Sequence, residues 1–216
     1  MSPMIIKDLR RHFGMARDQG PRPTCMAFAA SDAHAGVRPG WVPLSVEWAY
    51  FHALQRDGAR PHEGLSLSTM LATLCEDGQP VEAVWPYTAA LFADNPGYAP
   101  PTTDAPLYRR RSAPMPATVD DIIGSLDRDT PVLFTLSISR GFYSPAADGV
   151  ISAHEPVEPA RVHALIAVGH GVRGIDRFVL VRNSWGNGWG LNGHGWLDAT
   201  YLTPRLLVAA TLAGEP

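Results

Sequence analysis

Hydrophobic positions up to about residue 90 follow the spacing of amphipathic helices. An alanine-rich segment covers residues 25–35 and is followed by a glycine, a residue type that commonly ends helices. A second apolar face begins after Ser45, and a third begins after Ser66 or Ser68 and ends near Gly78. Serine hydroxyls often accept from the free N–H groups of a first helical turn. The pattern therefore predicts three helices in this part of the chain.

The pattern changes in the second part of the chain. Residues 93–118 are rich in Pro, Asp and Thr, which predicts a surface connection, and a short helix is expected at 118–128. Runs of β-branched and other apolar residues then predict strands at 132–138, 162–168 and 177–183. Helices first and strands afterwards favour an α+β fold with a helical lobe packed against an antiparallel β lobe.

Two of the predicted strands form a hairpin that would bring two polar residues together. The connection at 169–176 contains several glycines, and a hairpin symmetric about Arg173 places His163 opposite Asn183. Directly opposed side chains have Cβ atoms roughly 4.5–5.5 Å apart, so an amide oxygen could accept from one imidazole nitrogen. Taken singly, each residue has a plainer interpretation, a satisfied half-buried histidine and a turn asparagine at a strand end.

Cys25 stands in the first turn of the first predicted helix, after Pro23 and Thr24. The positive end of the helix dipole favours the thiolate over the thiol there. A small buried apolar residue is the plainer interpretation of a lone cysteine. However, Gln19 lies upstream across a Gly/Pro turn, and a histidine and an asparagine follow far downstream. A thiol, an imidazole and an amide in this order are the parts of a cysteine nucleophile with its base and orienting group.

Three separated motifs resemble the papain-like cysteine peptidase family. The chain reads Gln-Gly at 19–20 and Cys-Met-Ala-Phe at 25–28, then His-Ala at 163–164, and finally Asn-Ser-Trp-Gly at 183–186 followed by Gly-Trp-Gly at 188–190. The middle of the chain, with Leu-Ser at 44–45 and Trp-Pro-Tyr at 85–87, is similar to intracellular-type bacterial members. The resemblance covers nearly the whole chain and is weakest at 91–115. It implies a papain-like two-lobe fold with the active site between the lobes.

The resemblance also implies a role for each matching residue. Cys25 would be the nucleophile, His163 the general base and then acid, and Asn183 the residue that orients the imidazole ring. The Gln19 amide and the Cys25 backbone N–H would form the oxyanion hole. Trp185 would shield the Asn183–His163 hydrogen bond from water. The residues expected to contact substrate, several of them at an apolar pocket, are Trp185, Gly64, Val162, Ala164 and Thr135.

The cysteine content departs from the family pattern. Most members carry a second cysteine in the loop before the nucleophile, whereas this loop reads Pro-Arg-Pro-Thr at 21–24, and its two prolines could stiffen it. Cys75 lies on the third predicted helix and is interpreted as a buried structural thiol. A chain without a disulfide framework is expected in a reducing compartment, which favours a cytoplasmic protein, with export as an effector as an alternative.

Composition agrees with a compact enzyme and excludes other classes. The chain has 216 residues, 45% hydrophobic content and a net charge of −3, so neither a nucleic acid nor a membrane is an expected partner. The first residues lack a signal-peptide pattern. We expect one catalytic domain over 1–216, with a helical lobe at about 20–110 and a β lobe at 111–216, on which the N-terminal residues pack.

Only eighteen residues precede Gln19, whereas members of this family usually carry a longer inhibitory prosegment. If no prosegment exists, control is expected from narrow specificity, from export, or from a partner protein that inhibits or activates the enzyme. The expected partner in the reaction is a peptide or protein substrate. No cofactor and no metal is expected, because the histidines lack a His-Glu-x-x-His motif or paired-cysteine spacing.

The residues leave more than one activity open. A cysteine endopeptidase that forms a Cys25 thioester is the leading hypothesis. The same nucleophile and base could instead deliver the acyl group to an amine, as in a transpeptidase, acyltransferase or amidase. A catalytically silent binding module is the third alternative, and the four intact polar residues argue against it.

Overall fold

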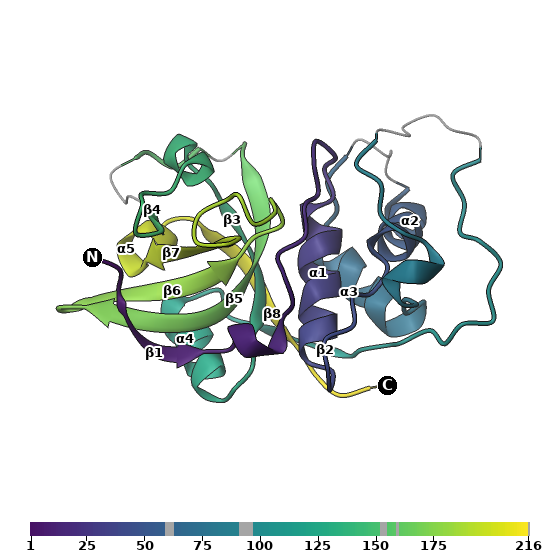
Figure 1. Cartoon of the computed structure of the whole chain (residues 1–216), viewed down its shortest axis with the longest axis horizontal. Coiled ribbons are helices and arrows are strands. Elements are labelled where there is room, and N and C mark those ends of the chain that lie inside the picture. The colour runs from purple at the N-terminus through teal and green to yellow at the C-terminus, as the bar shows by residue number, and fades with distance from the viewer. Residues whose placement is uncertain (59–62, 91–96, 152–154, 159, 216) are drawn as a thin grey trace.

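The computed structural model describes residues 1–58, 63–90, 97–151, 155–158 and 160–215. Its helices lie mainly in the first part of the chain and its strands mainly in the second, as the hydrophobic pattern predicts. Figure 1 shows the two groups as neighbouring lobes, with α1 standing between the sheet and the other helices of its lobe. The two-lobe α+β expectation is confirmed.

The helices of the first lobe begin at the predicted positions. The Ser45 hydroxyl accepts from Trp48 N at the start of α2, and the Ser66 hydroxyl accepts from Thr69 N at the start of α3, so Ser66 rather than Ser68 caps that helix. A glycine in the left-handed region, Gly58, ends α2. The helices are α1 (Cys25–Gly36), α2 (Val46–Asp57), α3 (Leu67–Glu76), α4 (Val119–Asp127) and α5 (Ala199–Leu202), with short 3-10 turns η1 (Arg10–His12), η2 (Glu82–Val84) and η3 (Arg140–Tyr143).

Within the described residues, eight strands form one sheet, in the order β2-β8-β3-β5-β6-β7-β4 with β1 also paired to β5. All pairs are antiparallel except β4–β7. The pairing of β1 joins the N-terminal residues to the β lobe. The strands are β1 (Met4–Asp8), β2 (Ser112–Met115), β3 (Val132–Ser137), β4 (Val150–Ile151), β5 (Val162–Arg173), β6 (Asp176–Arg182), β7 (His194–Asp198) and β8 (Leu206–Leu212).

Two details of the predicted strands are wrong. The stretch 93–118 is not connection throughout, because 112–115 form β2 against β8. The hairpin between β5 and β6 closes through Gly174 and Ile175, so the strands extend through most of the segment that was expected to be loop. Gly174 has a φ of +63°, which suits the tight turn and which side-chain-bearing residues rarely adopt. Arg173 is itself paired with Asp176, so the hairpin is not symmetric about Arg173, and a bulge near Val168 shifts the register by one residue beyond it.

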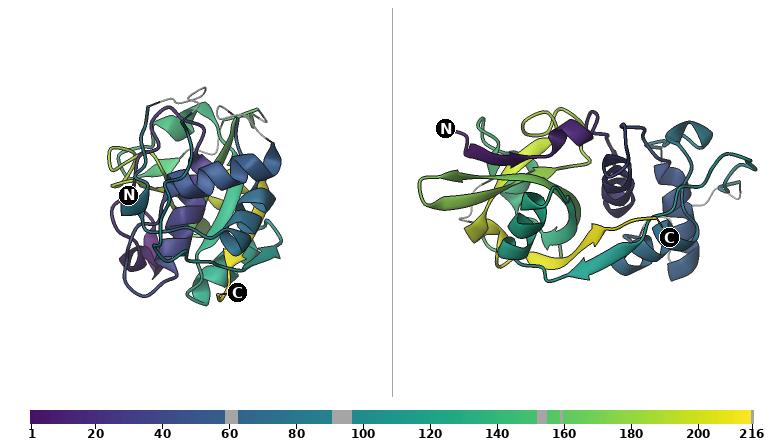
Figure 2. Two further views of the ribbon diagram at one scale, coloured as in Figure 1. Left: turned by 90° about the vertical axis from the view of Figure 1, so that its right-hand side faces the viewer. Right: turned by 90° about the horizontal axis from the view of Figure 1, so that it is seen from below.

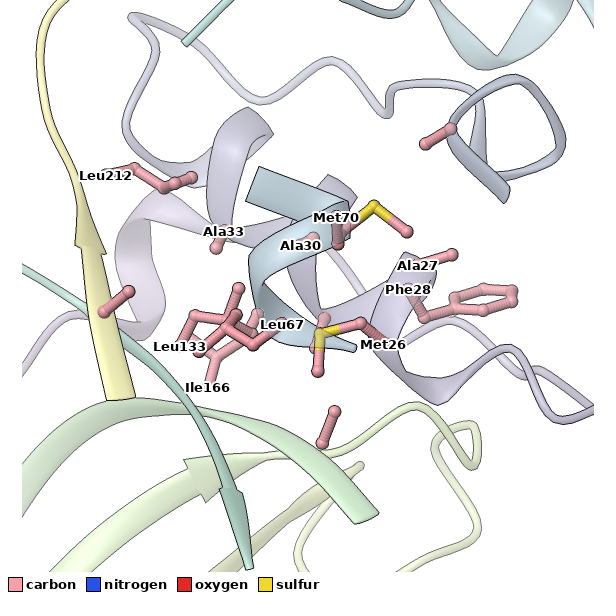
Figure 3. Close-up of a cluster of buried hydrophobic side chains, with 14 of the residues drawn as sticks. Met26, Ala27, Phe28, Ala30, Ala33, Leu67, Met70, Leu133, Ile166 and Leu212 are labelled. Atoms are coloured by element: carbon pink, nitrogen blue, oxygen red, sulfur yellow. The ribbon is translucent and has the colours of Figure 1, made fainter. Parts of the chain in front are cut away.

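Helix α1 is buried on every side because it packs between two layers. Its residues after Cys25 are all buried, and small alanines allow the close approach of α2 and α3 on one side and the sheet on the other. Figure 3 shows this core, in which Met26 and Ala33 of α1 lie among side chains of α3 and the sheet strands. The turned views in Figure 2 show that β2 and β8 extend from the sheet along the helical lobe. The first residue of a rigid, buried helix is therefore held at the lobe boundary.

Among the described residues, no helix has the length and apolar character needed to cross a bilayer.

Candidate active site

Helix α1 places Cys25 at its first position, half-buried at the boundary between the lobes. The hydroxyl of the preceding Thr24 does not cap the helix, since it lies 3.0 Å from the Tyr87 hydroxyl instead. The first backbone N–H groups of α1 therefore have no side-chain cap from Thr24. Such groups carry partial positive charge, which favours an anion at this end of the helix.

The β lobe brings His163 and Asn183 into direct contact. The Nε2 atom of His163 lies 2.7 Å from the Oδ1 atom of Asn183, and both side chains are buried. An amide oxygen only accepts, so Nε2 carries the hydrogen in this contact and Nδ1 is left for the thiol. The same Oδ1 accepts from Ser184 N at 2.8 Å, which fixes the orientation of the amide.

This contact forms although the predicted cross-strand pairing is wrong. His163 is paired with Leu136 of β3, and Asn183 follows the last residue of β6. The residue opposite Ile166 is Arg182, so Asn183 is not directly opposite His163. The loop after β6 orients the asparagine instead, because Asn183 N donates to Gly193 O at 2.9 Å. Gly193 is required there, since an added Cβ would lie 2.1 Å from Ala16 Cβ.

Aromatic rings cover the His163–Asn183 contact. The Trp185 ring centroid lies 4.7 Å from that of His163, and Phe142 lies edge-on to both rings. Tyr143 stacks on Trp185 at 5.1 Å and is half exposed. Trp185 thus occupies the position that the shielding role requires. Excluding water lowers the local dielectric and strengthens the hydrogen bond beneath.

The environment of Cys25 favours its thiolate. Burial would raise the pKa of the Cys25 thiol, but a hydrogen bond to His163 and the nearby imidazole charge lower it, as do backbone hydrogen bonds from Ala164 and Met26. The net effect lowers the pKa of Cys25 from the ordinary value of a thiol. A thiolate beside an imidazole is the reactive form of a cysteine nucleophile.

Gln19 is held next to this pair by both lobes. Its Oε1 atom accepts from Ser184 Oγ at 2.6 Å, and its Nε2 atom donates to Arg22 O at 2.8 Å. Its backbone carbonyl accepts from the Tyr87 hydroxyl at 2.6 Å. One Nε2 hydrogen remains after the bond to Arg22. The arrangement therefore holds the Gln19 amide in one orientation, with one donor hydrogen unused.

A buried ion pair anchors the loop between Gln19 and Cys25. The guanidinium of Arg22 contacts the carboxylate of Glu47 on α2, with 3.0 Å between Nη2 and Oε2, and both side chains are almost fully buried. Tyr98 donates to the same carboxylate at 2.6 Å, and Arg22 Nη1 donates to Thr88 O at 2.7 Å. Sequence reasoning missed this network. The only signal was an arginine between two prolines, at a loop where the family usually has a cysteine.

A second buried network ties the lobes together beside Asn183. Arg182 of β6 lies 2.8 Å from Asp32 of α1, and its Nη atoms donate to the carbonyls of Gly14 and Met15 at 2.7 Å. Arg17 binds the other oxygen of Asp32 at 2.6 Å. The residue before Asn183 is therefore fixed to the helix that carries Cys25.

The sequence profile described as papain family cysteine protease matches residues 81–201, which is more than half of the chain. This chain belongs to the papain family of cysteine proteases. The matched segment includes His163, Asn183 and Trp185.

Curated relatives of this papain-family protein are remote. An uncharacterised peptidase C1-like protein of Acanthamoeba polyphaga mimivirus is 25% identical over 209 residues, which cover 89% of this chain and 67% of the relative. Cathepsin R of Mus musculus is 26% identical over 189 residues, covering 82% of this chain and 54% of the relative. A cysteine protease of Blomia tropicalis is 31% identical over 80 residues, which are 37% of this chain and 24% of the relative. The chain thus spans between about a quarter and two thirds of these relatives' lengths.

Solved structures agree on the fold. Xylellain, a cysteine protease from Xylella fastidiosa, superposes with a TM-score of 0.82 at 22% identity, over 97% of this chain and 86% of xylellain. Digestive procathepsin L 3 of Tenebrio molitor gives a TM-score of 0.73 at 16% identity, over 99% of this chain and 73% of the other. At these identities the likeness shows the fold alone, and that fold is the papain-like one.

An apolar cavity of about 590 Å³ adjoins the first turn of α1 in this papain-family protein. The predicted residues Thr135 and Val162 line it, together with Met26 from α1. None of its described lining residues carries a charge. The sequence analysis did not predict most of the lining residues. These come from α3 and the loop before it, from β2 and from β8, and include Leu65, Leu67, Leu71, Met115, Leu207 and Val208.

The other predicted substrate-contacting residues lie around this cavity. Ala164 is paired with Thr135 across β5 and β3 and is buried, and its backbone hydrogen-bonds the Cys25 thiol. Gly64 is exposed, with open space where a Cβ would stand, and it immediately precedes the lining residue Leu65. Cys75 is partly exposed rather than buried, because the side of α3 on which it lies is not fully covered.

Among the described residues, no group of three or more His, Cys, Asp or Glu side chains is arranged to hold a metal ion.

Proposed function

We propose that this protein hydrolyses peptide bonds as a cysteine endopeptidase. The observation that carries the proposal is the chain of contacts from the Cys25 thiol to His163 and from His163 to Asn183. Family membership supports the same chemistry.

With Cys25 as nucleophile and His163 as its base and acid, the reaction proceeds in two steps. In the first, the Cys25 thiolate attacks the peptide carbonyl carbon, and the protonated His163 gives its proton to the departing amine. The new carbon–sulfur bond replaces the carbon–nitrogen bond and leaves a thioester. In the second, His163 takes a proton from water as the water oxygen attacks the thioester. The carboxylic acid leaves and the thiolate is restored. Asn183 keeps the ring in position through both steps.

Negative charge on the carbonyl oxygen would be stabilised by two donors. These are the remaining Gln19 Nε2 hydrogen and the Cys25 backbone N–H, which begins α1. Preset donors of this kind need no rearrangement when the charge develops. The contacts of Gln19 with Ser184 and Arg22 support this role because they fix the amide before substrate arrives.

The apolar cavity beside the nucleophile supports a preference for substrates with an apolar side chain near the scissile bond. Its volume of about 590 Å³ accommodates a leucine or an aromatic side chain, and the lining residues that the structure describes offer no charged partner. We assign it to the residue two positions before the scissile bond, the P2 residue.

We also propose that the protein works in a reducing compartment. Cys25 and Cys75 are both free thiols, and the Arg22–Glu47 pair fixes the nucleophile loop without a cross-link. Fractionation of the source cells, with a probe for the native protein, tests this.

The peptidase proposal is tested by intact-mass labelling with a peptidyl epoxide. Wild type is expected to gain one adduct, Cys25→Ala none, and the matched control Cys75→Ala one. Mass analysis of peptide digests then separates hydrolysis from transfer to an amine, because only transfer adds the mass of the amine. A folded wild type that neither labels nor cleaves peptides would overturn the proposal.

A further inference from the structure

A second cavity, of about 510 Å³, lies at the other end of α1 from Cys25. Its walls come from both lobes, with 36–39 at the end of α1 on one side and 129–131 between α4 and β3 on the other. The segment 212–214 closes it, and Figure 1 shows this C-terminal end of the chain beside the foot of the helical lobe. A helix of twelve residues spans roughly 18 Å, so the cavity is separate from the site of Cys25.

Among the charged and titratable side chains described in the lining of this cavity, most are basic. Three arginines, Arg11, Arg38 and Arg110, reach it, together with His12. Among the described lining residues, the carboxylate is that of Asp129. It already forms ion pairs with two other basic residues, at 2.9 Å from Lys7 and 3.7 Å from Arg11. Arg38 and Arg110 therefore contribute positive charge that this aspartate does not balance.

Arg110 is the most informative residue of the group. Its side chain is nine-tenths buried, its Nη1 atom donates to Ala213 O at 3.1 Å, and its buried Nε has no hydrogen-bond partner. In the part of the chain that the structure describes, no carboxylate lies within 4.0 Å of Arg110 or of Arg38. A buried guanidinium with a free donor and no paired anion is costly to maintain.

The groups around Arg110 shift its pKa in opposite directions. Burial lowers its pKa, the Glu215 carboxylate nearby raises it, and the charge of Arg38 lowers it again. Glu215 is exposed near the end of the chain, and the carboxyl end of α1 offers only about half a negative charge. Arg38 lies over the Tyr108 ring, 3.5 Å from its centroid, which keeps its guanidinium beside the cavity.

We propose that this cavity binds a small oxyanion, a phosphate or carboxylate group, between Arg110 and Arg38. Planar guanidinium groups match the oxygens of such anions and form paired, charge-assisted hydrogen bonds with them. The apolar side chains of Leu9, Phe13 and Val37 in the same lining reduce the exposure of the site to water. The volume leaves room for an organic group attached to the anion.

Occupancy of this site would stabilise the packing of the two lobes. The cavity walls belong to both lobes, so an anion held there contacts groups that separate when the lobes unfold or move apart. A ligand that binds only the folded state stabilises it by RT ln(1 + [L]/Kd), so above Kd the midpoint of thermal unfolding keeps rising with the logarithm of the ligand concentration. For a chain of this size, a ligand at ten times its Kd is expected to raise Tm by roughly 3–6 °C.

The test is a titration of the full-length protein with inorganic phosphate, succinate or sodium chloride at matched ionic strength. Thermal unfolding and isothermal calorimetry are read for wild type, Arg110→Gln, Arg38→Gln and Arg109→Gln. Arg109 is the control, because it is adjacent in sequence, donates to Glu76 O and does not line the cavity. Arg38 is only half-buried, so its variant remains informative if Arg110→Gln fails to fold.

Saturable binding heat and a Tm that rises with the logarithm of ligand concentration above Kd, present in wild type and Arg109→Gln and lost in Arg38→Gln, would support the site. Comparing phosphate with succinate tells which oxyanion it prefers. A stabilisation equal in all variants, or none beyond that of sodium chloride with either anion, would overturn it. The readouts need no peptidase activity, so this proposal and the proposed function fail independently.

Discussion

The Nε2 atom of His163 and the Oδ1 atom of Asn183 lie 2.7 Å apart, although the two residues are not paired across the β5–β6 hairpin. The loop after β6 supplies the orientation, through the bonds from Asn183 N to Gly193 O and from Ser184 N to Oδ1. The ring of His163 therefore contacts an amide that backbone hydrogen bonds hold in place.

Asn183→Ala is expected to lower kcat by about 10²-fold with little change in KM, because a misaligned imidazole cannot transfer protons efficiently. Steady-state kinetics on a peptide with an apolar P2 residue measures this. The Gly188→Ala variant is the control, since open space surrounds that position in the same loop. An equal loss in kcat for the control would assign the effect to loop disturbance instead.

Alkylation of Cys25 should extend to lower pH than alkylation of an ordinary thiol. Burial raises the pKa of Cys25, but the His163 hydrogen bond and charge lower it overall. The rate of reaction with iodoacetamide is followed by peptide mass mapping over a range of pH. The pH at which this rate falls off should therefore be lower for Cys25 than for glutathione. The His163→Ala variant removes the hydrogen bond and charge that lower the pKa of Cys25, whereas burial still raises it. The fall-off of the alkylation rate should therefore move to higher pH. An unmoved fall-off would contradict the assigned pairing.

The folded state should lose stability as the pH falls below about 6.5. Burial, then the charges of Arg110 and Arg38, lowers the pKa of His34 to about 3, and burial, then Arg182, lowers that of His194 to about 4. Both stay neutral in the folded protein, whereas the unfolded chain takes up protons near pH 6.5. Each histidine should contribute a slope of up to about 1.4 kcal/mol per pH unit between pH 6.5 and 4.

Urea unfolding at several pH values, in a Cys25→Ala background that prevents self-digestion, measures this slope. His34→Gln and His194→Gln should each remove about half of this histidine contribution, and the double variant should remove it. If the double variant keeps the full slope, the acid sensitivity has another source.

Removing one partner of the buried Arg22–Glu47 pair should be strongly destabilising. Glu47→Gln leaves a buried guanidinium without its counter-charge and is expected to cost about 3–5 kcal/mol of unfolding free energy. Replacing both residues together, as Arg22→Met with Glu47→Leu, should cost much less, because no charge is left unpaired. Chemical denaturation of the two variants tests the difference, and equal losses would mean that packing dominates.

The same pair should also influence catalysis through Gln19. Arg22 O accepts from Gln19 Nε2, so a loosened loop should lower kcat more than it raises KM in the variants that still fold. Kinetics at a temperature well below each variant's Tm separates this effect from global unfolding.

The apolar cavity that we assign to the P2 residue should change its substrate preference when a charged residue is introduced into its lining. Thr135 lines the cavity and is buried, and the other lining residues within the described part of the chain are uncharged. Thr135→Asp should raise kcat/KM for Lys or Arg at P2 relative to Leu by at least about tenfold, because the new carboxylate pairs with the cation and disfavours the apolar side chain. Thr135→Asn, of similar size but neutral, is the matched control. No difference between the two variants would place the P2 side chain elsewhere.

The sequence by itself determined the secondary structure around the site and the identity of its polar residues. Alanine spacing defined α1, serine caps defined α2 and α3, and Cys25, His163, Asn183 and Gln19 stood in recognisable motifs. These features depend on interactions between residues close in the chain, which a sequence displays directly.

Only the tertiary structure decided the exact register of β5 and β6, the buried ion pairs and the second cavity, at the far end of α1 from Cys25. The bulge near Val168 shifts the hairpin because β5 must pair with β1, β3 and β6 together, and no local pattern states that requirement. Glu47 is paired with Arg22 and accepts from Tyr98, and both partners are distant from it in the sequence. Arg38 and Arg110 are likewise distant in the sequence, and only the folded chain brings both to the lining of one cavity. Charges are compensated, or left uncompensated, by neighbours in space, so their consequences appear only after folding.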